Sequence, residues 1–218
     1  MSDDKLMETN RSSKPYQQLA ESIVFNNKRN HMKLISYNYQ ELELIGSGRS
    51  AYVFRIRGRN IAIKVFYPPF EHLAQKEASV YERLAGISYF PILYNSGKNF
   101  IVIDFVEGLT LFGCLVTGKQ MNRSILSDVD DAIKHARERG LNPSDIHLHN
   151  ILITPTERII LIDVVRFTQK NRCNQWNDLK KAYDLFYHKP FFPKRLPSKL
   201  LLCIAFLYKK GLFRRIFN

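Results

Sequence analysis

The chain has 218 residues, and its 45% hydrophobic content is enough to bury a core, which excludes a protein that is disordered throughout. It holds 33 Lys and Arg against 20 Asp and Glu, and the formal net charge of +13 favours anionic partners such as nucleotides, nucleic acid, phospholipid headgroups or acidic proteins. The 3 Cys lie far apart and indicate neither a disulfide framework nor a paired-cysteine zinc site.

Three features of the sequence predict a soluble, cytoplasmic protein. The first residues, MSDDKLMETN, are polar and are not followed by an apolar segment, so we expect no secretory signal. The longest apolar run, residues 200–208, has about half the length that a membrane-spanning helix needs. The unpaired Cys residues also fit a reducing compartment.

The first half of the chain predicts a polar extension, an antiparallel sheet and one helix. Residues 1–36 are polar with a basic cluster, and we expect a tail or a loosely attached extension there. Alternating apolar residues then predict a meander, whose strands span residues 39–46, 51–56 and 60–67. Residues 70–84 lack Gly and Pro and carry apolar residues at helical spacing, so they predict a helix. Two short strands are expected after it, at about residues 92–94 and 99–105.

After Gly108 the pattern changes to longer helices around a short hairpin. The expected helices and strands span residues 127–139, 151–154, 159–165 and 176–187. Ser127 or Asp128 is expected to cap the first of these helices, and Gly140 to end it. Residues 189–218 contain no acidic residue and interleave Lys and Arg with apolar side chains.

The turn between the first two strands is rich in small residues. Gly46, Gly48 and Ala51 occupy the three positions of a G-x-G-x-x-G pattern, and Val53 follows. Because the turn joins two strands, the pattern argues against a dinucleotide fold and for a flap over nucleotide phosphates, where backbone N–H groups approach the anions. A Gly-rich hairpin without a ligand fits the same residues.

A lysine on the third strand and a glutamate on the following helix form a candidate ion pair. The strand alternation places Lys64 on one face with Ala62 and Phe66, so it can point inward. A buried ammonium needs an anion, and Glu77 supplies one from the apolar face of the helix. The alternative is a solvated strand lysine and an ordinary helix acid.

Six stretches stand in the order of the signature elements of the protein-kinase superfamily: GSGRSAYVF, AIK, KEASVYERL, IVIDFVEG, DIHLHNILI and LIDVV. The resemblance covers about residues 42–163 and implies an α+β, two-lobed protein-kinase-like fold with an antiparallel-sheet N-lobe and a reduced helical C-lobe. The chain would then consist of an N-terminal extension, an N-lobe, a C-lobe and a basic amphipathic C-terminal segment, at residues 1–36, 37–107, 108–190 and 191–218.

The resemblance implies an ATP site. Lys64 matches the lysine that binds the phosphates, Glu77 matches its ion-pair partner, and residues 104–108 match the hinge whose backbone binds the adenine edge. The residues that would bind the nucleotide are Gly46, Gly48, Ala51, Val53, Lys64, Asp104 and Val106.

The resemblance also assigns the reaction centre. Asp145 and Asn150 hold the five-residue spacing of the catalytic loop, in which the Asp accepts or orients the proton of the attacking hydroxyl group. Asn150 would supply an amide oxygen to Mg²⁺, and Asp163, at the end of an apolar strand, matches the aspartate that binds the bridging Mg²⁺.

Two histidines lie within this loop. His147 stands where common protein kinases carry a Lys that contacts the γ-phosphate, and a similar His occurs in kinases for antibiotics, sugars and lipopolysaccharide cores. It would contact phosphate or support the loop, and we count it with the catalytic residues. His149 has no such correspondence. A zinc site from His147, His149 and His135 is the weaker interpretation, because no Cys or further ligand accompanies them.

The chain departs from the superfamily pattern at several positions. Ala51 replaces the third flap glycine, a small change that the backbone tolerates. Pro143 and Ser144 stand where His and Arg usually precede the catalytic Asp, which argues against control by a phosphorylated activation loop. Val164 and Val165 replace the usual Phe and Gly, so a switch of that Phe is not expected.

The part of the chain after Asp163 is too short for a long activation segment and a helical peptide-binding subdomain. It is similar to the tail of the compact bacterial kinases that modify lipopolysaccharide sugars, where a Trp and a Leu-rich helix close the lower lobe. Trp176 is expected to be a core residue.

The basic C-terminal segment, LLCIAFLYKKGLFRRIFN, has two open interpretations. As an interfacial helix it would lie on an anionic membrane, and the protein would be peripheral at the inner membrane face. As a structural helix it would pack on the lower lobe and leave its basic face solvated. The basic and apolar residues concerned are Lys209, Lys210, Leu212, Phe213, Arg214, Arg215, Ile216 and Phe217. Nucleic acid is disfavoured because no reading motif accompanies the charge.

We therefore predict an ATP- and Mg²⁺-dependent kinase that transfers the γ-phosphoryl group to a hydroxyl group, and we favour a bacterial serine/threonine protein-kinase-like enzyme. The alternative is a small-molecule or glycolipid kinase of the lipopolysaccharide-sugar type, which His147 and the missing peptide platform favour. A third interpretation is a nucleotide-binding pseudokinase that acts as a scaffold. A non-catalytic domain has no chemical need for all five of the residues that argue against it, which are Lys64, Glu77, Asp145, Asn150 and Asp163. The acceptor of the phosphoryl group would be a hydroxyl group of either a protein or a small molecule.

Overall fold

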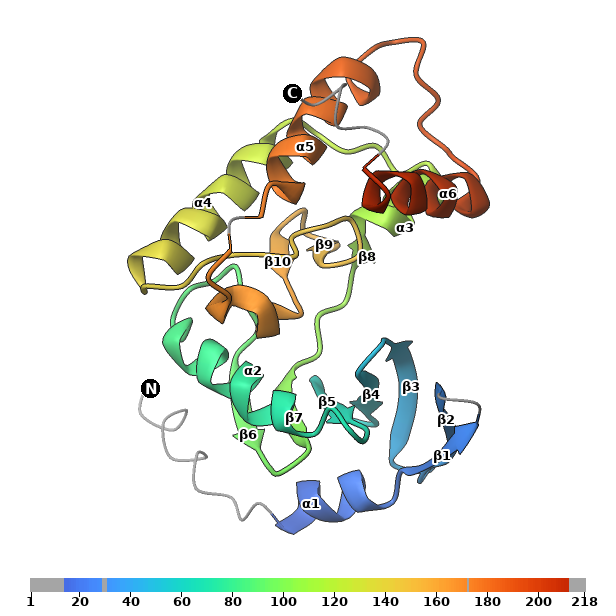
Figure 1. Ribbon diagram of the computed structural model, residues 1–218, viewed down its shortest axis with the longest axis vertical. Coiled ribbons are helices and arrows are strands. Elements are labelled where there is room, and N and C mark those ends of the chain that lie inside the picture. The colour runs from blue at the N-terminus through green and yellow to red at the C-terminus, as the bar shows by residue number, and fades with distance from the viewer. Residues whose placement is uncertain (1–13, 29–30, 172, 212–218) are drawn as a thin grey trace. The chain divides into compact units, whose positions relative to one another are not determined.

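The computed structural model describes residues 14–28, 31–171 and 173–211, and the chain divides into two compact units (Figure 1). Unit 1 comprises Met1–Gly86 and Phe90–Val106, and unit 2 comprises Ile87–Tyr89 and Glu107–Asn218. Unit 1 is built on a sheet and unit 2 mainly on helices, so the α+β class predicted from the sequence is confirmed.

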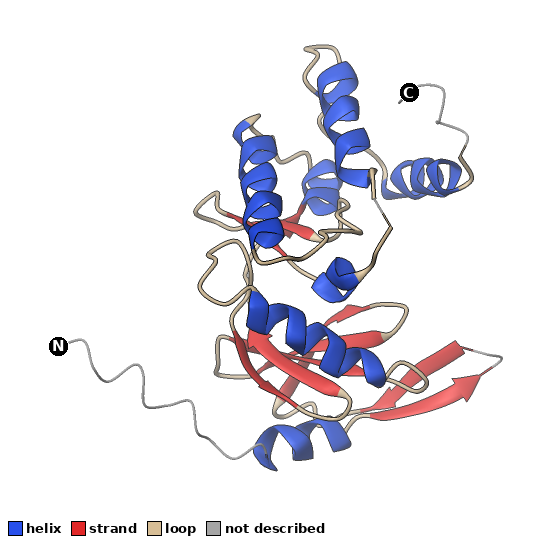
Figure 2. Ribbon diagram, turned by 60° about the vertical axis from the view of Figure 1, so that its left-hand side comes forward, coloured by secondary structure: helices blue, strands red, loops and turns tan. Residues whose placement is uncertain are grey.

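Five antiparallel strands form the main sheet of unit 1, in the order β3-β4-β5-β7-β6. They are β3 (Leu42–Ser47), β4 (Ala51–Ile56), β5 (Ile61–Phe66), β6 (Leu93–Ser96) and β7 (Phe100–Asp104). Short turns make β3, β4 and β5 neighbours, as the alternation predicts, and the β6–β7 hairpin adds to the free side of β5. Helix α2 (His72–Arg83) connects β5 to β6 and contacts β5, β6 and β7, and Figure 2 shows it lying across the strands.

The two faces of this sheet bury different residues. Ile63 and Val65 of β5 belong to a hydrophobic cluster on one face, together with Leu42, Phe54, Ile56, Phe100 and Val102. Because successive strand residues point to opposite faces, Lys64 points to the other face. Helix α2 contacts β5, and its buried side chains include Glu77.

The N-terminal segment differs from the expected polar extension. It forms helix α1 (Lys14–Glu21) and a hairpin of β1 (Val24–Lys28) and β2 (His31–Ser36). Leu19, Ala20 and Ile23 are buried in the same cluster as Ile63 and Val65. The expectation of a loosely attached tail is therefore wrong for these residues, because apolar side chains at helical spacing dock α1 on the sheet although the segment is mostly polar. Residues 1–13 lie outside the described residues.

Unit 2 contains a small sheet with helices around it. Strands β8 (Leu109–Thr110), β9 (Ile151–Ile153) and β10 (Ile159–Leu161) are arranged in the order β10-β9-β8. Helix α3 (Leu111–Thr117) contacts β8 and β9, and helix α4 (Ser124–Glu138) contacts β10. The buried face of α4 consists of Ile125, Val129, Ala132, Ile133 and Ala136, at the spacing of a helix with one apolar stripe.

Helix α4 begins earlier than the sequence predicts. Ser124 is its first residue, and its N-cap residue Arg123 makes no side-chain capping hydrogen bond. The capping role predicted for Ser127 or Asp128 is therefore wrong, because the apolar stripe extends back to Ile125 and the helix forms along it.

The strand that begins at Ile159 ends at Leu161, before the predicted residue 165. Asp163 has a left-handed backbone, with φ 58° and ψ 57°, and a 3-10 helix η1 (Val164–Thr168) follows it. The left-handed residue ends the ladder, because a strand cannot continue through that conformation.

The last elements are α5 (Gln175–Ala182), a π-helical turn η2 (Tyr183–Tyr187) and α6 (Ser198–Lys209). Trp176 is buried, and its Nε1 donates to Asp130 Oδ1 at 2.7 Å, so it packs in the core and ties α5 to α4. None of the helices within the described residues combines the length and the apolarity that crossing a bilayer requires.

Candidate active site

The Gly-rich turn is the tip of the β3–β4 hairpin in unit 1. Gly46 pairs with Val53, and a Cβ built on Gly46 would lie 3.7 Å from the Val53 Cβ. The Gly48 N–H donates to the Ala51 carbonyl at 2.8 Å, and the Gly48 carbonyl accepts from the Tyr67 hydroxyl at 3.2 Å. The sequence therefore folds as a tight hairpin with small residues at its tip, a geometry that a phosphate flap and a simple hairpin share.

Lys64 lies on the same face of the sheet as the flap residue Val53. The two are directly opposite each other on β4 and β5, and Ile101 of β7 is opposite Lys64 on its other side. Opposite residues of antiparallel strands project to one face, so the three side chains form a row across the sheet. The candidate flap residue Val53 and Lys64 are therefore neighbours on one face of the sheet.

Lys64 and Glu77 form a buried ion pair. The Lys64 Nζ lies 2.9 Å from Glu77 Oε1 and 2.7 Å from Glu77 Oε2, and the exposed fractions of the two residues are 8% and 0%. Glu77 reaches the lysine from the buried stripe of α2, which also contains Ala74, Ala78 and Tyr81. The interpretation of Lys64 as a solvated strand lysine is excluded by this burial.

The burial of this pair calls for a reason other than stability. Removing an ammonium and a carboxylate from water costs several kcal/mol per ion, and a hydrophobic replacement of such a pair is often neutral or stabilising. A functional role would explain why charged residues occupy these positions, because a lysine fixed by a carboxylate presents its ammonium to an anionic ligand in one orientation.

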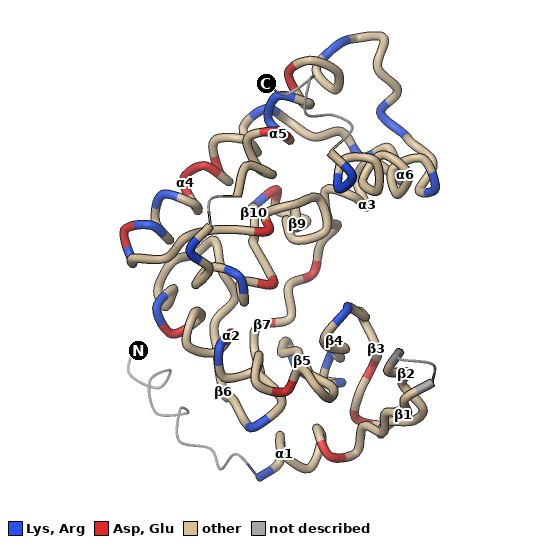
Figure 3. Tube along the Cα trace, in the orientation of Figure 1, with Lys and Arg blue, Asp and Glu red and all other residues tan. Residues whose placement is uncertain are grey.

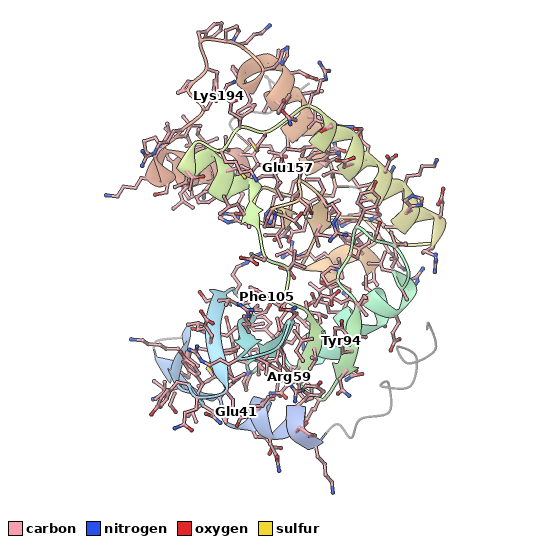
Figure 4. All side chains as sticks on the ribbon, turned by 180° about the vertical axis from the view of Figure 1, so that it is seen from behind. Glu41, Arg59, Tyr94, Phe105, Glu157 and Lys194 are labelled. Atoms are coloured by element: carbon pink, nitrogen blue, oxygen red, sulfur yellow. The ribbon has the colours of Figure 1, made fainter. Side chains whose placement is uncertain are left out.

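The predicted hinge follows β7 at the end of unit 1. The Asp104 carboxylate accepts from the Ile92 N–H at 2.8 Å and from the Tyr94 hydroxyl at 2.7 Å, and the bond to this carboxylate raises the pKa of Tyr94 to about 12. Figure 4 labels Tyr94 and Phe105 in this region. The side chain of Asp104 thus holds the β6–β7 hairpin, and the Asp104 N–H donates to the Ile92 carbonyl at 3.1 Å, so a nucleotide would be bound by backbone groups after Asp104. The Phe105 N–H is already bonded to the Asn60 carbonyl at 3.0 Å.

The loop from Asp145 to Asn150 in unit 2 is closed by hydrogen bonds between its own ends. The Asn150 side-chain amide donates to the Asp145 carbonyl at 3.0 Å, and the Asn150 N–H donates to the His147 carbonyl at 2.9 Å. Asp145 itself has a positive φ of 62°. Because the NH₂ group of Asn150 is used inside the loop, its Oδ1 is the atom that remains for a metal ion.

Asn150 and Asp163 emerge from the same end of the β9–β10 hairpin. Ile151 pairs with Leu161, and the Ile162 N–H donates to the Asn150 carbonyl at 3.0 Å, so Asp163 comes one residue after a position bonded to Asn150. Asp163 has a left-handed backbone, an unusual conformation that clusters at functional sites. An amide oxygen and a carboxylate are donors that Mg²⁺ prefers, so these two residues fit a Mg²⁺ site.

The carboxylate of Asp145 lies between two nitrogen-bearing side chains. Arg166 Nε is 3.3 Å from Asp145 Oδ2, and His147 Nε2 is 3.7 Å from Asp145 Oδ1. His147 Nδ1 accepts from the His149 N–H at 3.3 Å, so a neutral His147 ring carries its proton on Nε2, facing the carboxylate. Sequence reasoning missed Arg166, whose only signal is its position three residues after Asp163.

His149 has a packing role. Its ring stacks on Phe112 of α3, with ring centroids 4.1 Å apart and an interplanar angle of 24°. Burial, followed by the charges of His147 and Lys209, lowers the pKa of His149, so the ring is neutral at neutral pH. The Phe112 N–H also donates to the Leu148 carbonyl at 3.0 Å, so α3 holds this loop at two points.

The alternative zinc site is not assembled. His135 stacks on Tyr89 and its Nδ1 lies 3.1 Å from Glu138 Oε2, so its ring is engaged on α4. Within residues 14–28, 31–171 and 173–211, no group of three or more His, Cys, Asp and Glu side chains is placed to hold a metal ion.

Comparison with known proteins decides the family. A Bacillus subtilis protein named "Putative serine/threonine-protein kinase YrzF" is 44% identical over 201 residues, which cover 91% of this chain and 93% of that protein. The chain belongs to the protein-kinase-like family. The serine/threonine-protein kinase PrkC of Bacillus subtilis is 29% identical over 149 residues, or 60% of this chain and 23% of PrkC. A probable serine/threonine-protein kinase of Clostridium acetobutylicum is 27% identical over 147 residues, or 60% of this chain and 22% of that protein. No protein-family model matches.

Family membership confirms the resemblance to protein kinases and the protein-kinase-like fold. The antiparallel sheet with α2 corresponds to the expected N-lobe, and the helices around β8, β9 and β10 correspond to the expected reduced C-lobe. The roles of the individual site residues remain predictions.

The Lys64–Glu77 pair makes a prediction for stability. Lys64→Met leaves the Glu77 carboxylate buried without its partner, so the free energy of unfolding should fall by about 3 to 5 kcal/mol. The double variant Lys64→Met/Glu77→Leu buries no charge and should recover most of that loss. Chemical denaturation followed by circular dichroism measures both, and Lys98→Met, at an exposed lysine of unit 1, is the control. A double variant as unstable as Lys64→Met would show that the buried charge of Glu77 is not the cause of the lost stability.

Proposed function

We propose that the chain transfers the γ-phosphoryl group of ATP to a hydroxyl group, as a serine/threonine protein-kinase-like enzyme. The observation that carries the proposal is the buried Lys64–Glu77 pair, because an ammonium held by a carboxylate at a sheet face next to a Gly-rich hairpin suits the phosphates of a nucleotide. The kinase names of the relatives support the same reaction.

The predicted nucleotide-binding and metal-binding residues would each contact a different part of the ATP–Mg²⁺ complex. The N–H groups of the hairpin tip around Gly48 would approach the phosphates, and Lys64 would bind phosphate oxygens. The backbone between Asp104 and Val106 would bind the adenine edge. Asn150 Oδ1 and the Asp163 carboxylate would hold Mg²⁺, which neutralises phosphate charge when it is bound.

The phosphoryl transfer itself needs little covalent work from the protein. The acceptor oxygen forms a bond to the γ-phosphorus, the bond between that phosphorus and the β,γ-bridging oxygen breaks, and ADP leaves. Asp145 would orient the acceptor hydroxyl group and take up its proton. His147, with its Nε2 proton facing Asp145, would support that carboxylate or contact the transferred group.

The acceptor class is the open part of the proposal. We favour a protein hydroxyl, because the names of the three relatives describe serine/threonine protein kinases. A sugar or glycolipid acceptor of the lipopolysaccharide type is the second candidate, because His147 replaces the usual lysine. A pseudokinase scaffold would have no chemical need for Asp145 in its closed loop.

Phosphoryl transfer is predicted to depend on Asp145. Asp145→Ala should lower the rate by roughly 10²- to 10⁴-fold, because the acceptor proton loses its oriented base. The assay follows label from γ-labelled ATP into the protein itself, into myelin basic protein, and into lipid and sugar fractions, which separates the acceptor classes. Asp131→Ala, at an exposed carboxylate of α4, should retain the wild-type rate. Equal rates for both variants would remove Asp145 from the reaction.

Nucleotide binding is predicted to depend on Asp163 and Mg²⁺. ATP with Mg²⁺ should raise the melting temperature of the wild type and of Asp145→Ala, because a ligand that binds only the folded state stabilises it. In Asp163→Asn, most of the additional rise in melting temperature that Mg²⁺ causes in the presence of ATP should be lost. A wild-type chain that responds to ATP but transfers no label would favour the scaffold interpretation, and a chain that does neither would contradict the proposed function.

We further propose that an anionic membrane surface is a partner of the C-terminal segment. Helix α6 exposes Leu200, Leu202, Ile204 and Phe206 by 46%, 55%, 41% and 60%. Figure 3 shows Lys and Arg at both ends of α6 and along the loop before it. An exposed apolar helix with basic ends suits the interface of an anionic bilayer.

The alternative, in which α6 packs on the rest of unit 2, is supported by two observations. Leu201 is buried, and the Tyr208 hydroxyl donates to Asp178 Oδ2 at 2.6 Å. Leu212, Phe213, Ile216 and Phe217 lie outside the described residues.

Membrane binding is predicted to depend on the exposed side of α6. Leu202→Glu/Phe206→Glu should abolish cosedimentation with vesicles made of equal parts phosphatidylcholine and phosphatidylglycerol, because both apolar anchors become anionic. Tyr39→Glu, at a 70% exposed aromatic residue of unit 1, should bind as the wild type does. Wild-type protein that binds neither these vesicles nor pure phosphatidylglycerol vesicles would contradict the membrane proposal and leave the kinase proposal intact.

A further inference from the structure

Arg166 contacts the carboxylate that the proposed reaction needs. Its Nε lies 3.3 Å from Asp145 Oδ2, and the side chains of Arg166 and Asp145 are 48% and 15% exposed. The arginine comes from η1, the short helix directly after Asp163, and not from the catalytic loop. Two segments that are separate in sequence thus meet at one carboxylate.

The backbone that carries Arg166 is anchored on both sides. Val164 and Phe167 are buried, with exposed fractions of 0% and 2%. The Phe167 carbonyl accepts from the Asn142 N–H at 2.7 Å, and the Asn142 side-chain amide donates to the Gln169 carbonyl at 2.7 Å. Asn142 stands three residues before Asp145, so the same residue ties η1 to the start of the catalytic loop.

Stability does not explain the contact. A partly exposed ion pair contributes little to the free energy of unfolding, because solvent screens it and ordering two side chains costs entropy. A geometric role is a better account. Asp145 has a left-handed backbone, and its carboxylate can turn about the side-chain torsions unless a neighbour holds it. Arg166 holds Oδ2, whereas His147 faces Oδ1 at the longer distance of 3.7 Å.

We propose that Arg166 is a positioning residue that orients the Asp145 carboxylate toward the acceptor hydroxyl group. The inference rests on the proposed phosphoryl transfer and extends it to a residue from the segment after Asp163. Arg166 acts through Asp145, so its loss slows the transfer step and leaves the affinity for ATP unchanged.

The test compares Arg166→Gln, Arg166→Lys and the wild type in label transfer from γ-labelled ATP to myelin basic protein and to the chain itself. Arg166→Gln should lower kcat by roughly ten- to a hundredfold, since a small misplacement of a catalytic group has effects of that size. The KM for ATP and the melting-temperature increase with ATP and Mg²⁺ should not change. Arg166→Lys keeps the cation and should recover part of kcat. Arg158→Gln, at an exposed arginine of the β9–β10 turn, is the matched control and should behave as the wild type.

A double-mutant cycle separates positioning from a structural effect. If Arg166 acts through Asp145, Arg166→Gln should not lower the residual rate of Asp145→Ala any further. An equal fold-loss in both backgrounds would overturn the inference, and so would a kcat of Arg166→Gln equal to or above that of the wild type. A wild-type chain without transfer activity would refute the proposed function itself, a result that differs from all of these.

Discussion

The buried ion pair between Lys64 and Glu77 links the sheet of unit 1 to helix α2. An ammonium at 8% exposure requires a carboxylate within hydrogen-bonding distance, and that carboxylate comes from α2. The sheet register must therefore place Lys64 under α2, while Ile63 and Val65 complete the core on the opposite face, where α1 docks. Side chains of β5 alternate between the two faces of the sheet, so the hydrophobic core lies on one face and the candidate phosphate site on the other.

In unit 2 the candidate site depends on hydrogen bonds between segments and not on a single pair. The Asn150 amide closes the loop on the Asp145 carbonyl, the Ile162 N–H joins that loop to the strand before Asp163, and Asn142 joins it to η1. Stacking of His149 on Phe112 fixes the loop against α3. The two left-handed residues, Asp145 and Asp163, are held in this network, and such conformations persist where the surroundings determine them.

Much of this arrangement could be predicted from the sequence, because it follows from local periodicity. Alternation in β5 and helical spacing in α2 were sufficient to pair Lys64 with Glu77, and the strand boundaries of the meander were close to those observed. The remaining features depend on contacts between distant segments. The docking of α1 rests on a few apolar residues in a polar stretch, and the contact of Arg166 with Asp145 rests on the left-handed turn at Asp163, which no spacing rule indicates.

We propose that the chain keeps the buried Lys64–Glu77 pair in order to bind phosphate. Calorimetric titration of the wild type and of Lys64→Met/Glu77→Leu with ATP and Mg²⁺, and separately with adenosine, tests it most directly. The variant should bind adenosine as the wild type does and should bind ATP at least about tenfold more weakly, because charge-assisted hydrogen bonds to phosphate are lost. A folded variant with wild-type affinity for ATP would contradict the claim.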